Sequence, residues 1–151
     1  MAVILAFLIG IVAGARAMTA PAIISWAAWL GLLPLQGTLV AFLGYQYTPF
    51  ILTLLALFEL VSDQLPATPS RKVPIQFGTR LLMGALTGFA VAAPAGSVVL
   101  GLVAGIVGAV IGTLGGAALR AALAERVGNH PAAFIEDALA IGLAVIVVLL
   151  L

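Results

Sequence analysis

The sequence predicts an all-α membrane protein with six transmembrane helices in a single domain, residues 1–151. Of its residues, 64% are hydrophobic and 7% are charged, against roughly 45–50% and 25% in soluble domains. Its mean hydropathy is +1.32. A bilayer suits such a chain, because helices can turn apolar side chains toward lipid while they satisfy their own backbone groups.

Charged residues and prolines divide the chain into six apolar stretches. Most are near the roughly 20 residues needed to cross the hydrocarbon core. They cover residues 1–15, 17–35, 38–65, 81–96, 97–119 and 132–151. Residues 1–15 have no basic segment ahead of the apolar run, which favours a retained membrane helix. The alternative is a signal peptide cleaved after Ala13-Gly14-Ala15.

A long polar connection, residues 67–80, separates half one, residues 1–66, from half two, residues 81–151. Prolines before and within it forbid a continuous helix through this region. Three spans in each half make the halves enter the membrane from opposite sides, as in an inverted repeat. Gly10 and Gly14 match Gly84 and Gly88 at a constant offset, although chance also explains this.

The basic residues predict the orientation in the membrane. They occur at three places, which six spans put on one side: Arg16, then Arg71, Lys72 and Arg80, then Arg120 and Arg126. The positive-inside rule makes that side cytoplasmic. We therefore expect a multi-pass protein of the inner membrane, with both termini outside and the 67–80 connection in the cytoplasm.

Several predicted spans are short or contain helix-breaking positions. The second opens at Thr19-Ala20-Pro21, the third begins at Thr48-Pro49, and Pro131 suits the first helical position of the last. Interrupted membrane helices are typical of ligand sites that are built from helix ends. Residues 16–21 form either a re-entrant turn or an ordinary loop.

Four acidic residues fall within the predicted spans: Glu59, Asp63, Glu136 and Asp137. A charge at the membrane centre costs roughly 2.5–3.5 kcal/mol, whereas each central leucine returns only about 0.3–0.6 kcal/mol. We therefore expect a polar cluster of these acids with Arg16, completed by Arg80 or Arg120, and with Arg71 as further supporting charge. The alternative is that the acids reach up to the interface.

Small residues recur at three- or four-residue spacing along the fifth span, at Gly101, Gly105, Gly108, Gly112 and Gly116, with GxxxG at 101/105, 108/112 and 112/116. This spacing lets two helix backbones approach closely. The partner helix lies either in the same chain or in a second copy, which would make a homodimer.

The composition also narrows the classes of function. The chain has no cysteine, which excludes thiolate chemistry, and its single histidine does not suggest a metal site. Basic residues form no stripe for nucleic acid. We expect no cofactor, no metal and no nucleic acid, and partners limited to the bilayer, a small solute or ion, and a second copy.

Four segments in order resemble the domain-of-unknown-function 4126 family: GARAMTAP at 14–21, ELVSDQLPATPSR at 59–71, GTLGGAALR at 112–120 and FIEDALAIG at 134–142. The resemblance implies a small multi-spanning membrane protein, mostly bacterial, and no particular activity. Its charged positions correspond here to Arg16, Glu59, Asp63, Arg71, Arg120, Glu136 and Asp137. Gln64 departs from the lysine found in many members.

We expect a small transporter or channel-like protein for an ion or small polar solute, with one of the four acids as the coupling carboxylate and Arg16 as counter-charge or anion anchor. The alternative is a membrane scaffold that packs through the glycine-rich fifth span. An enzyme that uses paired acids as acid and base is less expected.

Overall fold

The computed structural model describes residues 1–65, 70 and 72–151, which form α-helices and no strand. The six α-helices confirm the predicted all-α class and helix number. Their bounds are α1 Ala2–Ala15, α2 Thr19–Trp29, α3 Thr48–Ser62, α4 Pro74–Ala92, α5 Val98–Val127 and α6 Asn129–Leu149. Two short 3₁₀ helices, η1 Ala41–Gly44 and η2 Ala93–Ala95, precede α3 and follow α4.

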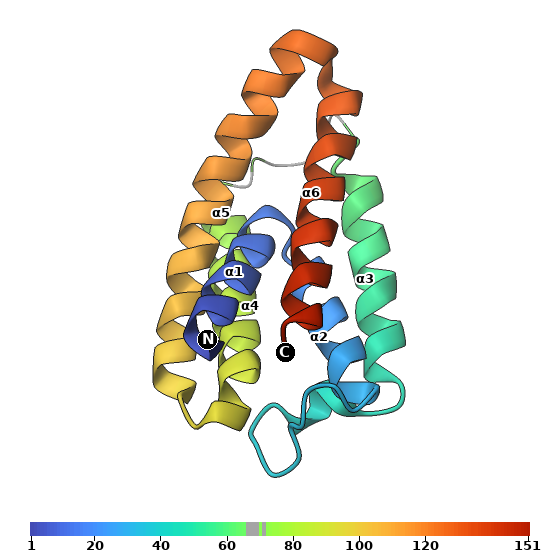
Figure 1. The fold of residues 1–151 in the computed structure, drawn as a ribbon. Coiled ribbons are helices and arrows are strands. Elements are labelled where there is room, and N and C mark those ends of the chain that lie inside the picture. The colour runs from blue at the N-terminus through green and yellow to red at the C-terminus, as the bar shows by residue number, and fades with distance from the viewer. Residues whose placement is uncertain (66–69, 71) are drawn as a thin grey trace.

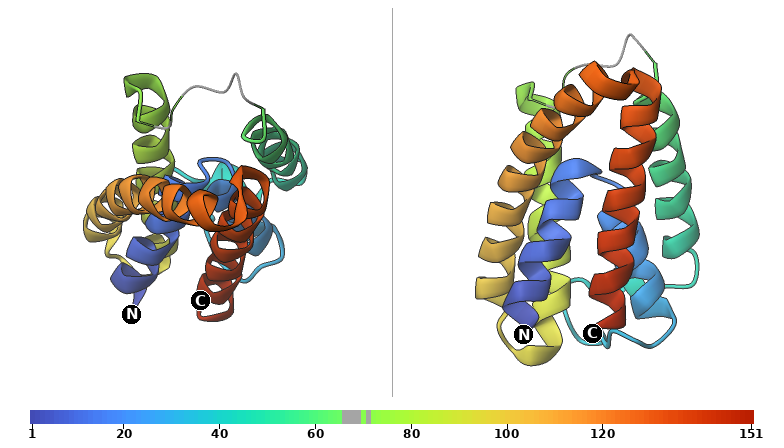
Figure 2. Two further views of the ribbon diagram at one scale, coloured as in Figure 1. Left: turned by 90° about the horizontal axis from the view of Figure 1, so that it is seen from above. Right: turned by 45° about the horizontal axis from the view of Figure 1, so that its top comes forward.

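Both chain termini lie at the same end of the bundle (Figure 1). Helices α1 and α2 form a hairpin that starts and finishes at this end, and α3 to α6 then run alternately between the two ends. Helix α5 packs against α1 and α4, which also pack against each other, whereas α3 lies at the margin against α2 and η1. Seen from above, α3 and α4 stand apart on the same side of α5 (Figure 2).

The helices fall into two length classes, with α1, α2 and α3 shorter than α4, α5 and α6. Among the described residues, three helices are long and apolar enough to cross a membrane, namely α4 with η2 (22 residues), α5 (30 residues) and α6 (21 residues). At about 1.5 Å per residue, the 14 residues of α1 and the 11 of α2 reach about 21 Å and 17 Å. Neither matches the roughly 30 Å hydrocarbon core, so the α1–α2 turn lies within the bundle.

Several predicted boundaries differ from the structure. The expected span 17–35 ends at Trp29, because the chain turns at Gly31, whose φ is +80°. The connection expected to run to residue 80 ends at Pro74, which opens α4 in its first turn, where a missing N–H has no cost. Arg80 and Arg120, expected in connections, therefore lie within α4 and α5.

Two predicted helix starts are close to the observed ones. Helix α3 begins at Thr48, with Pro49 in its first turn, but the Thr48 hydroxyl does not cap the helix and instead donates to the Phe42 carbonyl oxygen at 2.7 Å. Helix α6 begins at Asn129, which places Pro131 in the first turn rather than at its first position. Since all amides of a first turn lack helical partners, proline is tolerated at both places.

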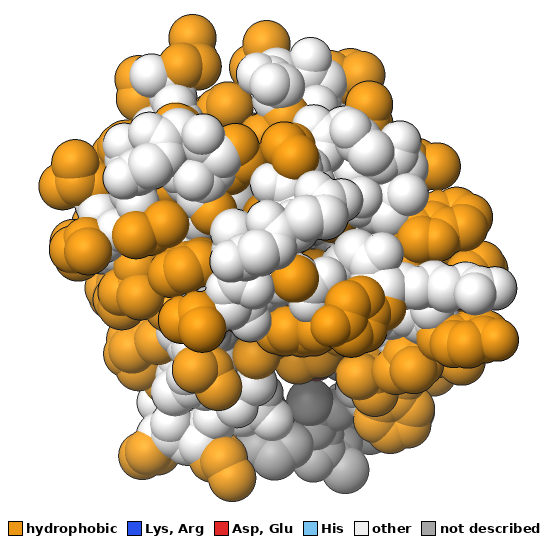
Figure 3. Space-filling view, turned by 90° about the horizontal axis from the view of Figure 1, so that it is seen from below, with side chains coloured by type: hydrophobic (Ala, Val, Ile, Leu, Met, Phe, Trp, Pro, Cys, Tyr) orange, Lys and Arg blue, Asp and Glu red, His pale blue; other side chains and the backbone are white. Residues whose placement is uncertain are grey.

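The outer surface of the bundle is apolar. Large hydrophobic side chains are exposed along α3, including Leu54 and Phe58, and along α5 and α6. Viewed from the end that carries the termini, hydrophobic side chains cover much of the face (Figure 3). Exposure of this kind would cause aggregation in water, and it matches the lipid-facing surface that the composition predicts.

The glycines of α5 hold the bundle together at close range. A Cβ at Gly105 would overlap the carbonyl oxygen of Gly84 and lie 3.0 Å from Gly88 Cα. Gly101 also faces α4, while Gly108 and Gly112 face the backbone of α1. These four glycines therefore pack within one chain, and Gly116 instead lines a groove between α5 and α6.

Candidate functional site

The break between α1 and α2 lies at the centre of the candidate site. Arg16 follows α1 in an extended conformation (φ −140°, ψ 103°), although its N–H still donates to the Val12 carbonyl. Such a break leaves carbonyls at the end of α1 and amides at the start of α2 without helical partners. Away from water, each of these groups needs another partner.

Side chains of α4 and α5 bind the carbonyls that end α1. Arg80 Nη1 donates to the carbonyl oxygens of Gly14 and Ala15, each at 2.7 Å. Thr113 Oγ1 lies 3.1 Å from the Gly14 oxygen and 2.7 Å from that of Ala109, on its own helix. A cation at a helix C-terminus also complements the helix dipole, so Arg80 stabilises the end of α1 in two ways.

A carboxylate from α3 binds the opposite side of the break. Glu59 accepts hydrogen bonds from the backbone N–H groups of Ala17 at 2.8 Å and Met18 at 2.9 Å. These residues directly precede α2, where a negative charge is favoured by the helix dipole. Arg80 Nη2 lies 3.8 Å from Glu59 Oε1 and thereby links the groups at the two helix ends.

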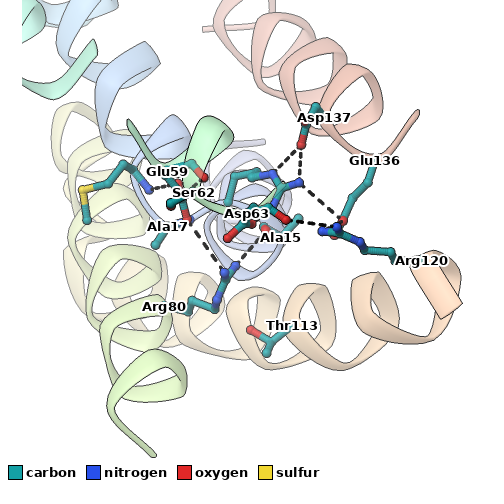
Figure 4. A network of polar contacts seen from close by, with 12 residues as sticks. Ala15, Ala17, Glu59, Ser62, Asp63, Arg80, Thr113, Arg120, Glu136 and Asp137 are labelled. Carbon is teal, nitrogen blue, oxygen red and sulfur yellow. Dashed lines mark hydrogen bonds and ion pairs between the residues drawn. The ribbon is translucent and has the colours of Figure 1, made fainter. Parts of the chain in front are cut away.

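Arg16 is fully buried, and its guanidinium lies near the three remaining acids of the site. It forms direct ion pairs with Asp63 and Asp137, with Nε donating to Asp137 Oδ1 at 2.5 Å. Its Nη2 lies 3.6 Å from Glu136 Oε2. Figure 4 shows these carboxylates converging from α3 and α6.

Arg120 of α5 extends the network. Its Nη1 lies 3.7 Å from Glu136 Oε2, and its Nη2 donates to the Asp63 carbonyl oxygen at 3.2 Å. The polar cluster therefore consists, among the described residues, of three arginines and four acids: Arg16, Arg80, Arg120, Glu59, Asp63, Glu136 and Asp137.

The match to a protein family covers almost the whole chain, residues 3–150. The chain belongs to the DUF4126 family, described as a domain of unknown function. No curated protein and no solved structure is significantly similar to this DUF4126 chain.

The polar cluster contains the residues predicted for it and one arginine more. All five principal residues meet, and both Arg80 and Arg120 join them where one of the two was expected. Glu136 and Asp137 are 3% and 8% exposed, so these side chains do not reach out to an interface. Arg71, the other supporting charge, lies outside the described residues.

The sequence did not point to every participant of this DUF4126 site. Thr113 was not singled out, and neither were the backbone amides of Ala17 and Met18. Thr19 is buried at the start of α2, and Pro21 lies in its first turn, as the predicted helix opening requires. Gln64 lies beside the polar cluster, with its Oε1 3.0 Å from His130 Nδ1.

Within the described part of the chain, no group of three or more His, Cys, Asp or Glu side chains is arranged to hold a metal ion. The acids of the polar cluster face guanidinium groups and backbone amides instead. A cavity of about 260 Å³ reaches Glu136 of the polar cluster. A second, of about 280 Å³, lies beside Met1, Pro94 and Leu151, at the end that carries the termini.

The contribution of Thr113 to the helix break is testable with a matched pair of substitutions. Thr113→Val should destabilise the protein by about 0.5–1 kcal/mol more than Thr87→Val. Both threonines are fully buried and bond a carbonyl four residues back in their own helix, but Thr113 also reaches Gly14. Unfolding in mixed micelles measures the difference, and equal losses would show that the bond to Gly14 contributes nothing.

Proposed function

We propose that this DUF4126 protein is a small membrane transporter or channel-like protein for an ion or small polar solute. The observation that carries the proposal is the α1–α2 break inside the bundle, where Arg16 meets three carboxylates and a fourth, that of Glu59, binds the Ala17 amide. Two helix ends directed at a buried polar centre are the arrangement from which transporters build substrate and coupling-ion sites. Ionisable groups at such a position are costly, which favours a functional role.

Glu59 is our candidate for the coupling carboxylate. It binds the two amides that begin α2 and also faces Arg80. A proton or cation that neutralises Glu59 would weaken both contacts at once. Because Glu59 joins α3 to the helix break, its neutralisation would loosen α3 from the rest of the site.

Helix α3 is the candidate moving element. Its buried residues are Pro49 and Ala56, and it packs mainly against α2 and η1. Its other ties to the bundle include the acidic contacts of Glu59 and Asp63 and the Trp26–Thr53 hydrogen bond of 2.9 Å. A helix with few packed contacts moves at low cost, so α3 could alternately cover and expose the polar cluster.

An inverted repeat of three plus three helices fits the directions of the chain. Corresponding helices of the two halves run in opposite directions in Figure 1: α1 is opposite to α4, α2 to α5 and α3 to α6. The two halves differ in length, since α2 has 11 residues and α5 has 30. We propose a diverged repeat in which the first half contributes the re-entrant hairpin and the second half the spanning helices.

We place the protein in the inner membrane. In the proposed orientation the termini lie outside the cell and the α3–α4 connection lies in the cytoplasm. Its support is that the loops near the termini, residues 30–47 and 93–97, carry no charge, while Arg126 lies at the far end. Trp29 and Tyr47 are exposed near the termini, as expected of aromatic side chains at a membrane interface.

Proteoliposomes test the transport proposal. Wild-type protein should produce a pH-dependent flux for at least one member of a panel of ions and small polar solutes. Glu59→Gln and Glu136→Gln should lower that flux by about tenfold or more, in line with loss of a required proton-transfer group. Glu125→Gln is the control, because Glu125 is exposed near the end of α5. Unchanged fluxes in both Glu59→Gln and Glu136→Gln would contradict the proposed coupling through these carboxylates.

A scaffold or homodimer that packs through the glycine-rich face of α5 has less support. Gly101, Gly105, Gly108 and Gly112 already contact α1 and α4. A second copy would have to use a different surface. The size of the purified protein in nanodiscs would measure whether a dimer forms.

A further inference from the structure

The cavity that touches the polar cluster is a groove between three helices. It has a volume of about 260 Å³, and α1, α5 and α6 supply its walls. Figure 1 shows α5 and α6 joined at one end of the molecule and separated below it, with α1 between them. Its lining side chains Ile111, Leu119 and Leu139 are exposed, so the groove opens to the outside of the bundle, and we name it the lateral groove.

The walls of the lateral groove are apolar along their length. They include Val12 and Ala15 of α1, Ile111 and Leu119 of α5, and Leu143 of α6. Such walls offer no replacement for the hydration shell of a small ion, whose transfer from water is very costly. Alkyl groups, in contrast, fit a concave apolar surface without loss of hydrogen bonds.

Glu136 provides the charge of the lateral groove, since it is the ionisable residue among the described residues that line it. Its side chain is 3% exposed, and its Oε2 lies 3.6 Å from Arg16 and 3.7 Å from Arg120. A carboxylate accepts several hydrogen bonds through its two oxygens, and it binds cationic N–H donors most strongly.

We propose that the lateral groove binds an amphiphile with a primary ammonium head and an alkyl chain. The chain lies between α5 and α6 against α1, and the ammonium donates to Glu136 at the end of the groove. Such a ligand enters from the bilayer rather than from water. This binding site is independent of transport, because the groove can hold an alkylamine whether or not the polar cluster conducts a solute.

Equilibrium binding to the protein in phosphatidylcholine nanodiscs tests the site, with empty nanodiscs subtracted. We expect saturable binding of dodecylamine that is at least about tenfold tighter than binding of dodecanol or dodecanoate, the effect of one charge-assisted contact. Equal binding of the three amphiphiles would overturn the proposal, as would absence of saturable dodecylamine binding. Both readings need only the wild-type protein.

Two glycine substitutions test where the alkyl chain of the ligand binds. A Cβ at Gly115 or at Gly142 meets no atom within 4 Å, so a side chain can begin at either position without a clash. Gly115 lines the lateral groove and Gly142 does not. Gly115→Leu should weaken dodecylamine binding by about tenfold or more while Gly142→Leu leaves it unchanged. Equal affinities in these two variants would place the ligand elsewhere and overturn the proposal.

Glu136→Gln should remove the preference for dodecylamine over dodecanol while binding of the alcohol persists. Retention of the preference would assign the head group to another residue and overturn the role of Glu136. The outcome is separate from that of the flux measurement, because Gly115→Leu leaves the acids of the polar cluster in place. In the wild-type protein, absence of saturable dodecylamine binding with normal flux rejects the amphiphile site alone, and normal binding without flux rejects transport alone.

Discussion

Arg16→Met should destabilise the protein by about 3–5 kcal/mol, the usual cost when one member of a buried ion-pair network is removed. Arg16 is fully buried and pairs with Asp63, Asp137 and Glu136. Without it, these acids would have to take up protons or draw water into the bundle. Reversible unfolding in mixed micelles measures the change, and a lower yield of monodisperse protein should accompany it.

Two further variants separate the loss of positive charge from the loss of the buried contacts. Arg16→Lys should recover part of the stability, because an ammonium supplies the charge but cannot reproduce the planar contacts of a guanidinium to several acids. Arg126→Met is the control for loss of positive charge, since Arg126 is exposed at the end of α5, and it should change stability by less than about 0.5 kcal/mol. Equal effects of Arg16→Met and Arg126→Met would contradict the buried network.

Gly105→Leu should prevent correct folding or cost more than about 3 kcal/mol, because overpacking against backbone leaves little room for relaxation. A Cβ at this position would overlap the Gly84 carbonyl and press on Gly88. Helices α4 and α5 would have to separate, and α1, which packs on both, would lose its support. The α1–α2 break would then lose its contacts to Arg80 and Thr113.

Gly115→Leu serves as the matched control on the same helix, since the space beside Gly115 is open. Its unfolding free energy should stay within about 1 kcal/mol of wild type, the small cost or gain of a surface helical change. Size-exclusion profiles and unfolding in mixed micelles compare the two variants. Similar losses for both would mean that the close approach of α4 and α5 is not required.

The sequence predicted most of the fold because a helix suited to a bilayer must be apolar and long, and both properties can be read from the residues. Apolar runs between charges gave the six helices, and proline and glycine marked where several begin or end. Two of the boundaries that failed involved Arg80 and Arg120. Both were assigned to connections because they are charged, although a charge also fits inside a helix when acids on other helices face it.

The candidate site could be predicted in its membership but not in its geometry. The cost of lone charge in lipid required Arg16 to meet acids such as Asp63 and Asp137. Nothing in the pattern showed that Glu59 would bind backbone amides or that Arg80 would bind carbonyls. Those contacts exist because α1 ends and α2 begins within the bundle, and their lengths depend on how the chain leaves Ala15 and Trp29.

The sequence by itself determined that this chain forms apolar helices suited to a membrane and that its few charges gather, since both follow from the free energy of moving side chains between water and lipid. Only the tertiary structure decided that the first two helices form a hairpin with a buried turn, that Gly105 packs within the chain, and that a groove leads to Glu136. The physical reason is that close packing and hydrogen-bond geometry depend on which helices meet, and residues far apart in the sequence settle that together.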